Sequence, residues 1–98
     1  MDEKQALAAL GALAQETRLH LYRLLAGSGL EGLSAGVIAE RLGVIPSSLS
    51  FHLTHLAHTG LITQRRLGRL MVYAANPGLM SELVGYLASN YATAAENA

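Results

Sequence analysis

The side chains that could do chemistry in this sequence are histidines and arginines gathered in its second half. They are His52, His55, His58, Arg65, Arg66 and Arg69. Between Arg41 and Ser81 the chain has no aspartate or glutamate, so this window is basic although the whole chain has a formal net charge of zero. Guanidinium groups bind phosphates, and a basic segment in a neutral protein favours contact with a polyanion. The alternative is an ordinary scatter of the seven basic residues along the chain.

The three histidines lie three residues apart, and each step of three turns about 60° around a helix. A zinc site needs further ligands at compatible distances, but this segment has no acid and the chain has no cysteine. We therefore expect no metal and no cofactor, and the histidine trio is the one place where a metal would still be sought. The chain also lacks a thiol nucleophile, a glycine-rich phosphate loop and a convergent acid–base pair, so we expect no catalytic residues and no enzyme.

Two short helices are expected to position the basic window. Ser34 suits the N-cap of a helix that runs to Leu42 and ends at Gly43. Pro46 suits the first position of the next helix, which Gly60 ends. A short connection between two such helices is typical of a helix-turn-helix. Two further helices, over residues 2–14 and 16–25, are predicted before this pair.

The hydrophobic period then changes from that of a helix to that of a strand. We expect strands at 61–67 and 70–75, joined by a type II′ turn in which Gly68 takes the first central position. Asn76 and Pro77 begin a final helix, and residues 92–98 are expected to fray. The order ααααββα predicts a single domain over residues 1–98, mainly α with a β-hairpin, which is a winged helix-turn-helix.

In their order and spacing, several stretches of the chain resemble the ArsR/SmtB family of winged-helix transcriptional repressors. The stretches are residues 13–19 (LAQETRL), 33–39 (LSAGVIA), 50–53 (SFHL), 60–62 (GLI) and 65–69 (RRLGR). The resemblance spans about residues 7–91. It implies a homodimer that pairs through its first and last helices and binds an imperfect inverted repeat in double-stranded DNA.

Metal-sensing members of that family bind their metals at sites that this sequence lacks. Where one such site has cysteines in the third helix, this chain has Ser34, Gly36 and Ala39. Where another uses aspartate and histidine in the last helix, residues 76–98 contain neither. We therefore expect a regulator that does not sense metals at these sites, and the identity of any small-molecule effector stays open.

The fourth helix of such a fold reads bases with its N-terminal residues, and the hairpin contacts the DNA backbone. The predicted DNA-binding residues are Ser47, Ser48, Ser50, Phe51, His52, Thr54, His55, Arg65, Arg66 and Arg69. Serine hydroxyls suit phosphates or either class of base, and Phe51 suits a thymine methyl group. Because strand residues alternate, Arg65 and Arg66 are expected on opposite faces. The alternatives are plain helix capping for the serines, a solvated charge cluster for the arginines and partly buried roles for the first two histidines.

The chain is too apolar for its size to cover all of its apolar surface alone, because 51% of its residues are hydrophobic and 14% are charged. The predicted dimer interface consists of Leu7, Leu10, Leu79, Leu83, Tyr86, Leu87 and Tyr91. The alternative is that these side chains form only the core of one chain. Tyrosines at such a seam could also line an effector pocket.

These observations predict a sequence-specific DNA-binding transcription regulator, a homodimeric repressor that acts at a pseudo-palindromic operator. The alternative function is a winged-helix protein–protein interaction module that binds an acidic partner through its basic hairpin. The chain has no apolar run of 18 to 20 residues and no signal peptide, so we expect a cytoplasmic protein that does not contact a membrane.

Overall fold

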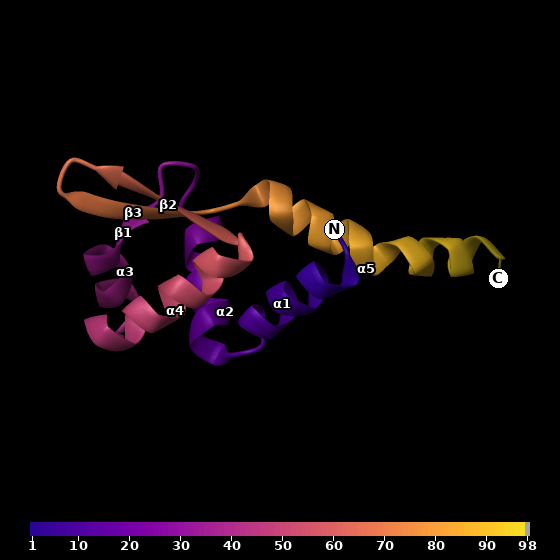
Figure 1. Ribbon diagram of the computed structural model, residues 1–98, viewed down its shortest axis with the longest axis horizontal. Helices are drawn as coiled ribbons and strands as arrows, with labels where there is room; N and C mark the ends of the chain where they lie inside the picture. Colours follow the sequence, from indigo (N-terminus) through magenta and orange to yellow (C-terminus); the bar gives the residue numbers. More distant parts are fainter. Residues whose placement is uncertain (98) are drawn as a thin grey trace.

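The computed structural model describes the backbone of residues 1–97 and the side chains of residues 1–89. Its elements are α1 (Glu3–Leu13), α2 (Glu16–Ala26), β1 (Leu33–Ser34), α3 (Ala35–Leu42), α4 (Pro46–Thr59), β2 (Ile62–Leu67), β3 (Leu70–Ala75) and α5 (Pro77–Asn97). Figure 1 shows α3, α4 and the β2–β3 hairpin at one end of the molecule, with α5 extending away from them. The predicted winged helix-turn-helix is confirmed, and the structure adds β1, which the sequence analysis missed.

The three strands form one antiparallel sheet in the order β1-β3-β2. A two-residue turn joins β2 to β3, and Leu67 pairs with Leu70 on either side of it. Gly68 has a φ of 63°, whereas no residue other than glycine has a positive φ in the described chain. A type II′ turn requires a positive φ at its first central position alone, so these angles agree with the predicted turn.

β1 connects the hairpin to the helix-turn-helix. Ser34 pairs with Val72 of β3, and its side chain also caps α3 by accepting the N–H of Val37. Gly32, just before the strand, has a φ of 74°, and a Cβ at this position would overlap the carbonyl oxygen of Tyr73. Only glycine therefore lets the chain pass this close to β3.

The core lies between the helices and the sheet. Its largest fully buried side chains are Leu21, Leu25, Ile38, Leu49, Leu56, Leu61 and Ile62. The buried residues of α1 are all alanines, namely Ala6, Ala9 and Ala12. These small side chains let α1 pack closely on α2 and α4, and the same helix turns Leu7 and Leu10 outward, at 63% and 37% exposure.

Asn76 lies between β3 and α5 and connects several segments. Its side-chain amide donates to the carbonyl of Gly60 at 3.0 Å, and its backbone N–H donates to the carbonyl of Leu61 at 2.9 Å. Its side-chain oxygen accepts the backbone N–H of Leu79 at 3.4 Å and so caps α5. The end of α4, the start of the hairpin and the start of α5 are therefore held at one residue.

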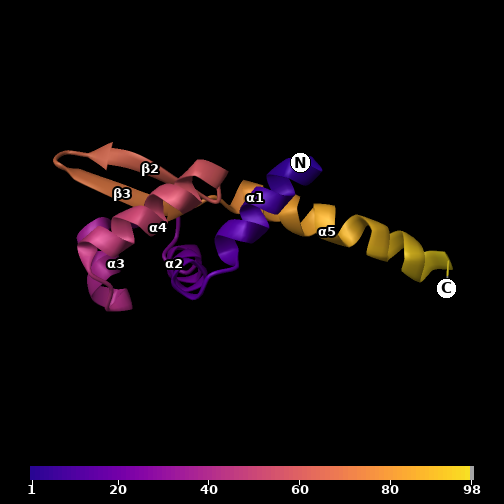
Figure 2. The ribbon, with the colours of Figure 1, turned by 60° about the horizontal axis from the view of Figure 1, so that its bottom comes forward.

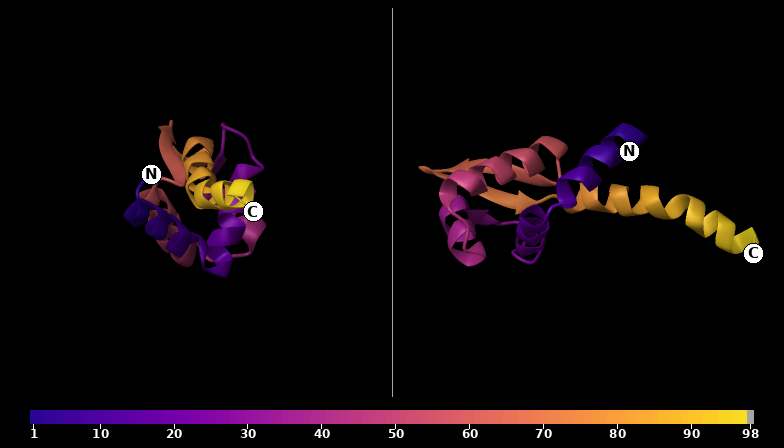
Figure 3. Two further views of the ribbon diagram at one scale, coloured as in Figure 1. Left: turned by 90° about the vertical axis from the view of Figure 1, so that its right-hand side faces the viewer. Right: turned by 90° about the horizontal axis from the view of Figure 1, so that it is seen from below.

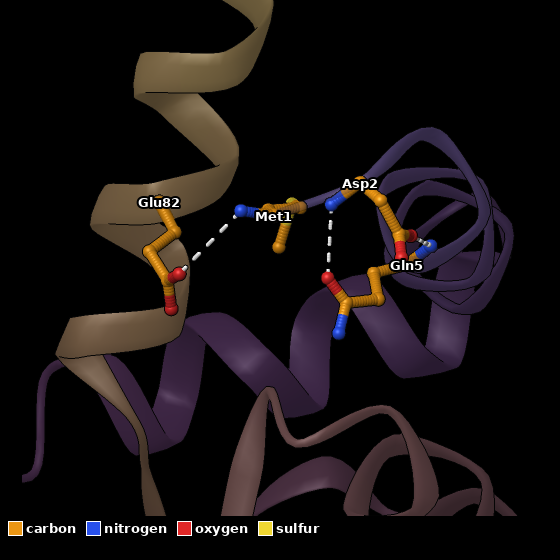
Figure 4. Close-up of polar contacts among 4 residues, drawn as sticks. All are labelled: Met1, Asp2, Gln5 and Glu82. Atoms are coloured by element: carbon orange, nitrogen blue, oxygen red, sulfur yellow. Dashed lines mark hydrogen bonds and ion pairs between the residues drawn. The ribbon is translucent and has the colours of Figure 1, made fainter.

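The backbone of α5 is helical as far as Asn97, whereas the sequence analysis expected residues 92–98 to fray. Figures 2 and 3 show α1 next to the beginning of α5, while the rest of α5 projects from the domain. At this contact the ammonium group of Met1 lies 3.8 Å from Oε1 of Glu82, and Asp2 and Gln5 exchange the hydrogen bonds that start α1 (Figure 4). Within the described chain, no helix has the length and apolar character to span a membrane.

Candidate nucleic-acid interface

α4 has one buried face and one face turned outward. It packs on the core through Leu49, Leu53 and Leu56. The predicted base-reading side chains lie away from this stripe: Ser47, Ser50, Phe51, Thr54 and His55 are exposed, and Ser48 and His52 are half-buried. The hairpin lies at the same end of the molecule as this helix (Figures 1 and 2). The outward residues of α4 and the arginines of the hairpin are therefore the candidates for a DNA-binding surface.

The start of α4 is open to an anion. Gly43 ends α3, Pro46 begins α4, and the N-cap residue Ile45 makes no side-chain hydrogen bond to the helix. The first backbone N–H groups of a helix carry partial positive charge and donate readily to phosphate oxygens. Ser47 and Ser48 in this first turn add hydroxyl donors, so the start of α4 suits a phosphate of the DNA backbone.

Phe51 is the largest apolar side chain on this surface, with 67% of it exposed. Its ring stands edge-on to His52 at 5.6 Å and to His55 at 6.4 Å between centroids. An aromatic ring left in water beside polar neighbours does not contribute to the core. It suits contact with a thymine methyl group in the major groove.

His52 is held by a residue that the sequence analysis did not assign to the site. Nη1 of Arg18, in α2, lies 3.3 Å from Nδ1 of His52, and Nε of Arg18 donates to the carbonyl of Ala12 at 2.6 Å. Burial, then the charge of Arg18 and then that of His55 lower the pKa of His52 below its usual value of 6.5. The two partners are far apart in the sequence, and no local pattern reveals their contact.

The arginines of the hairpin differ in their surroundings. Nη2 of Arg65 donates to the backbone carbonyl of Glu31 at 2.7 Å, so this side chain is turned back onto the loop before β1. Arg66 and Arg69 are exposed, and neither makes a hydrogen bond or ion pair to another described residue. Leu67 and Leu70 flank the turn, with 57% and 58% of their side chains exposed. Arg66 and Arg69 are therefore the hairpin cations best placed to meet phosphates.

The remaining histidines do not converge on a metal site. Across the part of the chain whose side chains are described, no group of three or more histidine, aspartate or glutamate side chains could hold a metal ion. His58 lies exposed near the end of α4, beyond the N-terminal turns that enter the groove in this fold.

The predicted dimer interface divides into buried and exposed parts. Leu83 is 2% exposed and belongs to the core of the single chain, so little of it is left for a partner, whereas Leu79 is half-buried against the core and stays a predicted interface residue. The exposed apolar side chains on α1 and α5 are Leu7, Leu10, Val84, Tyr86 and Leu87. Val84, with 57% exposure, is an addition that the sequence analysis missed, and the side chain of Tyr91 lies outside the described residues.

Comparisons with known proteins agree with this architecture. Residues 13–65, more than half of the chain, match the helix-turn-helix domain family. No curated protein matches the chain. An ArsR-like transcriptional regulator from Rhodococcus sp. RHA1 has the same fold, with a TM-score of 0.84 at 24% identity over 96% of this chain and 86% of that one.

Two other solved structures are similar at higher identity. The homodimeric winged helix-turn-helix DNA-binding domain of Mb0332 from Mycobacterium bovis, a possible ArsR-family transcriptional regulator, has a TM-score of 0.72 at 25% identity, covering 90% of this chain and 82% of that one. The transcriptional regulator HlyU from Vibrio vulnificus CMCP6 has a TM-score of 0.68 at 30% identity, covering 90% and 88%. The chain therefore belongs to the helix-turn-helix domain family, and within it to the ArsR-like winged helix-turn-helix transcriptional regulators.

Proposed function

We propose that the protein is a homodimeric transcriptional repressor that binds a pseudo-palindromic operator in double-stranded DNA. One observation carries the proposal: the molecule has a polar and basic surface on α4 and the hairpin and a separate apolar surface on α1 and α5. The first surface suits DNA, and the second suits a second copy of the chain. The homodimeric domain from Mycobacterium bovis, which has the same fold, supports this division.

The two parts of the DNA surface have different tasks in this proposal. Ser47, Ser48, Ser50, Thr54 and His55 of α4 lie at the major groove, where hydroxyl and imidazole groups meet phosphates and base edges. The exposed arginines of the hairpin contact the backbone, because guanidinium groups bind phosphate regardless of base identity. Specificity therefore comes from α4, and a large part of the affinity comes from the hairpin.

The dimer sets the form of the operator. A twofold axis between two copies gives two equivalent reading helices, so the operator is an inverted repeat. Half-site centres are expected about 10 base pairs apart, since the two helices enter successive major grooves. An effector that releases the DNA would act by changing the distance between the two helices.

The test is a selection of duplexes from a random double-stranded pool, followed by a footprint and a salt series on the selected duplex. An inverted repeat and a slope of log affinity against log salt on the order of −5 to −7 are expected for about three or four phosphate contacts per protomer. The matched control is Arg23→Ala, because Arg23 is an exposed arginine on α2, outside the DNA surface. Failure to enrich any duplex, together with binding to an acidic protein, would favour the interaction-module alternative.

A further inference from the structure

The side chain of Arg18 bridges three helices behind the DNA surface. Its backbone N–H donates to Oε1 of Gln15, which caps α2, at 2.8 Å. Its Nε donates to the carbonyl of Ala12 in the last turn of α1 at 2.6 Å. Its Nη1 reaches Nδ1 of His52 in α4 at 3.3 Å. One guanidinium group therefore joins the end of α1 to the helix that carries the base-reading residues.

This geometry determines which nitrogen of His52 carries the proton. A guanidinium group has only donors, so Nδ1 of His52 must accept the hydrogen bond with a lone pair. The ring is then neutral and its single N–H lies at Nε2. Nε2 has no hydrogen-bond partner among the residues whose side chains are described. His52 is also only half-buried, so this N–H is available to a ligand.

We propose that Arg18 is a specificity-determining residue, which holds His52 as the Nε2–H tautomer so that α4 offers a fixed N–H donor to the edge of a base. This inference rests on the proposed function of the same surface. A donor suits the acceptors of guanine, adenine or thymine in the major groove. Cytosine presents an amino donor there, so the base facing His52 is expected to be any base except cytosine.

Protonation of His52 removes this arrangement. The groups that face the ring are the Arg18 guanidinium from α2 and His55 from α4, and α1 contributes only the Ala12 carbonyl, bound to Arg18. No carboxylate is among them to stabilise the charged ring. A proton on Nδ1 would place two donors against each other, so the contact to Arg18 is lost. The additional positive charge would then strengthen binding to any duplex, while the fixed direction of the donor disappears.

The first test needs no DNA. Long-range nitrogen–proton NMR on ¹⁵N-labelled protein reports the tautomer of each imidazole, and a pH titration reports its pKa. In the parent, His52 is expected as the Nε2–H form. In Arg18→Met the tautomers mix and the pKa of His52 rises, whereas the matched control Arg23→Met changes neither. An Arg18→Met protein with an unchanged His52 tautomer overturns the proposal.

The second test uses the selected duplex and a copy in which cytosine replaces the base nearest His52 in each half-site. The parent is expected to prefer the first duplex about fivefold or more, the size of a typical single mismatch. Arg18→Met loses this preference and keeps the salt slope. Acidification of the parent also removes the preference, but it strengthens binding to both duplexes because His52 gains a charge. Because Arg18→Met could also loosen the fold, Arg18→Lys and His52→Ala are measured beside it, with thermal unfolding of each.

The outcomes separate the inference from the proposed function. Lysine keeps the charge but cannot reach both the Ala12 carbonyl and His52, so Arg18→Lys is expected to lose discrimination while it remains folded. His52→Ala removes the N–H donor itself, so it should abolish the same preference although Arg18 is intact. If the duplex is bound specifically and every variant keeps its discrimination, the inference is wrong and the proposed function stands. If no duplex is preferred although the tautomer responds to Arg18, the proposed function fails, and the specificity role falls with it.

Discussion

Truncation to alanine should have different effects at two leucines that lie one turn apart on α5. Leu83 is 2% exposed within the single chain, whereas Leu87 is 52% exposed. If α1 and α5 form the dimer interface, Leu87→Ala weakens association and leaves each protomer folded. Leu83→Ala instead leaves a cavity in the core of the protomer. The pair therefore distinguishes the interface from the core with one type of substitution.

The magnitudes follow from these exposures. Complete burial of a leucine side chain contributes about 1.5–3 kcal/mol, so covering the exposed half of Leu87 contributes about 1 kcal/mol. A twofold interface contains the residue twice, which gives about 2 kcal/mol and roughly a thirtyfold increase in the dimer Kd on truncation. A core leucine costs about 2–5 kcal/mol of the free energy of unfolding, and each kcal/mol lowers Tm by about 4–8 °C in a domain of this size.

Sedimentation equilibrium over a dilution series measures the dimer Kd, and thermal unfolding at a fixed protomer concentration measures stability. Leu70→Ala is the matched control, because Leu70 is 58% exposed but lies at the tip of the hairpin. An unchanged Kd in Leu87→Ala, or a folded monomer in the parent at micromolar concentration, would refute the assignment of the interface to α1 and α5.

Four further results are expected. Gly32→Ala should destabilise the fold severely, because the new Cβ overlaps the Tyr73 carbonyl, whereas Gly29→Ala, with the same φ of 74° and open space around it, should cost only about 1 kcal/mol in urea unfolding. The lowered pKa of His52 means that the unfolded chain takes up a proton first, so stability should fall as pH decreases below about 6.5, and less so in His52→Gln. Arg69→Ala should weaken binding to all duplexes and flatten the salt slope by about one unit per lost phosphate contact, or about two per dimer. Equimolar zinc should leave DNA binding, measured by fluorescence anisotropy, unchanged.

A specific result would contradict each of these four predictions. Equal free energies of unfolding for Gly32→Ala and Gly29→Ala would mean that the close approach of Gly32 to β3 does not exclude a Cβ. A free energy of unfolding that rises on acidification would mean that folding raises the pKa of His52 and does not lower it. An Arg69 variant with the parent's salt slope but an altered base preference would place that arginine at base edges in the minor groove. Stoichiometric zinc binding that releases the operator would identify a metal site that the sequence analysis did not predict.

The helices and the hairpin could be predicted from the sequence because their signals are local. Ser34, Gly43 and Pro46 mark the ends of α3 and α4 through their own backbone preferences, and Gly68 marks the turn in the same way. β1 could not be predicted, since two residues carry no periodicity and their pairing with β3 depends on distant sequence.

The side-chain contacts of the site could not be predicted either, because they also join residues that are distant in the sequence. Arg18 and His52 are 34 residues apart, and no local spacing links them. Arg65 binds a backbone carbonyl, a group that every residue has, so no pattern distinguishes its acceptor. The sequence predicts an apolar stripe on α5. Which of its side chains are buried in the core and which are exposed depends on how α1 packs beside it.

The hydrogen bonds of Asn76 bear on how a protein with this fold could come to bind a different operator sequence. Asn76 bonds Gly60 at the end of α4 and the first turn of α5 through its side chain, and Leu61 before the hairpin through its backbone N–H. If two copies pair through α1 and α5 as proposed, the separation of their α4 helices depends on how Asn76 joins α4 to α5. On the proposed function, substitutions on the outward face of α4 would change which bases are preferred and leave the gap between half-sites constant. A wider or narrower gap between half-sites would then be expected to involve substitutions at Asn76 or at the apolar surface of α1 and α5, which lie outside the DNA surface.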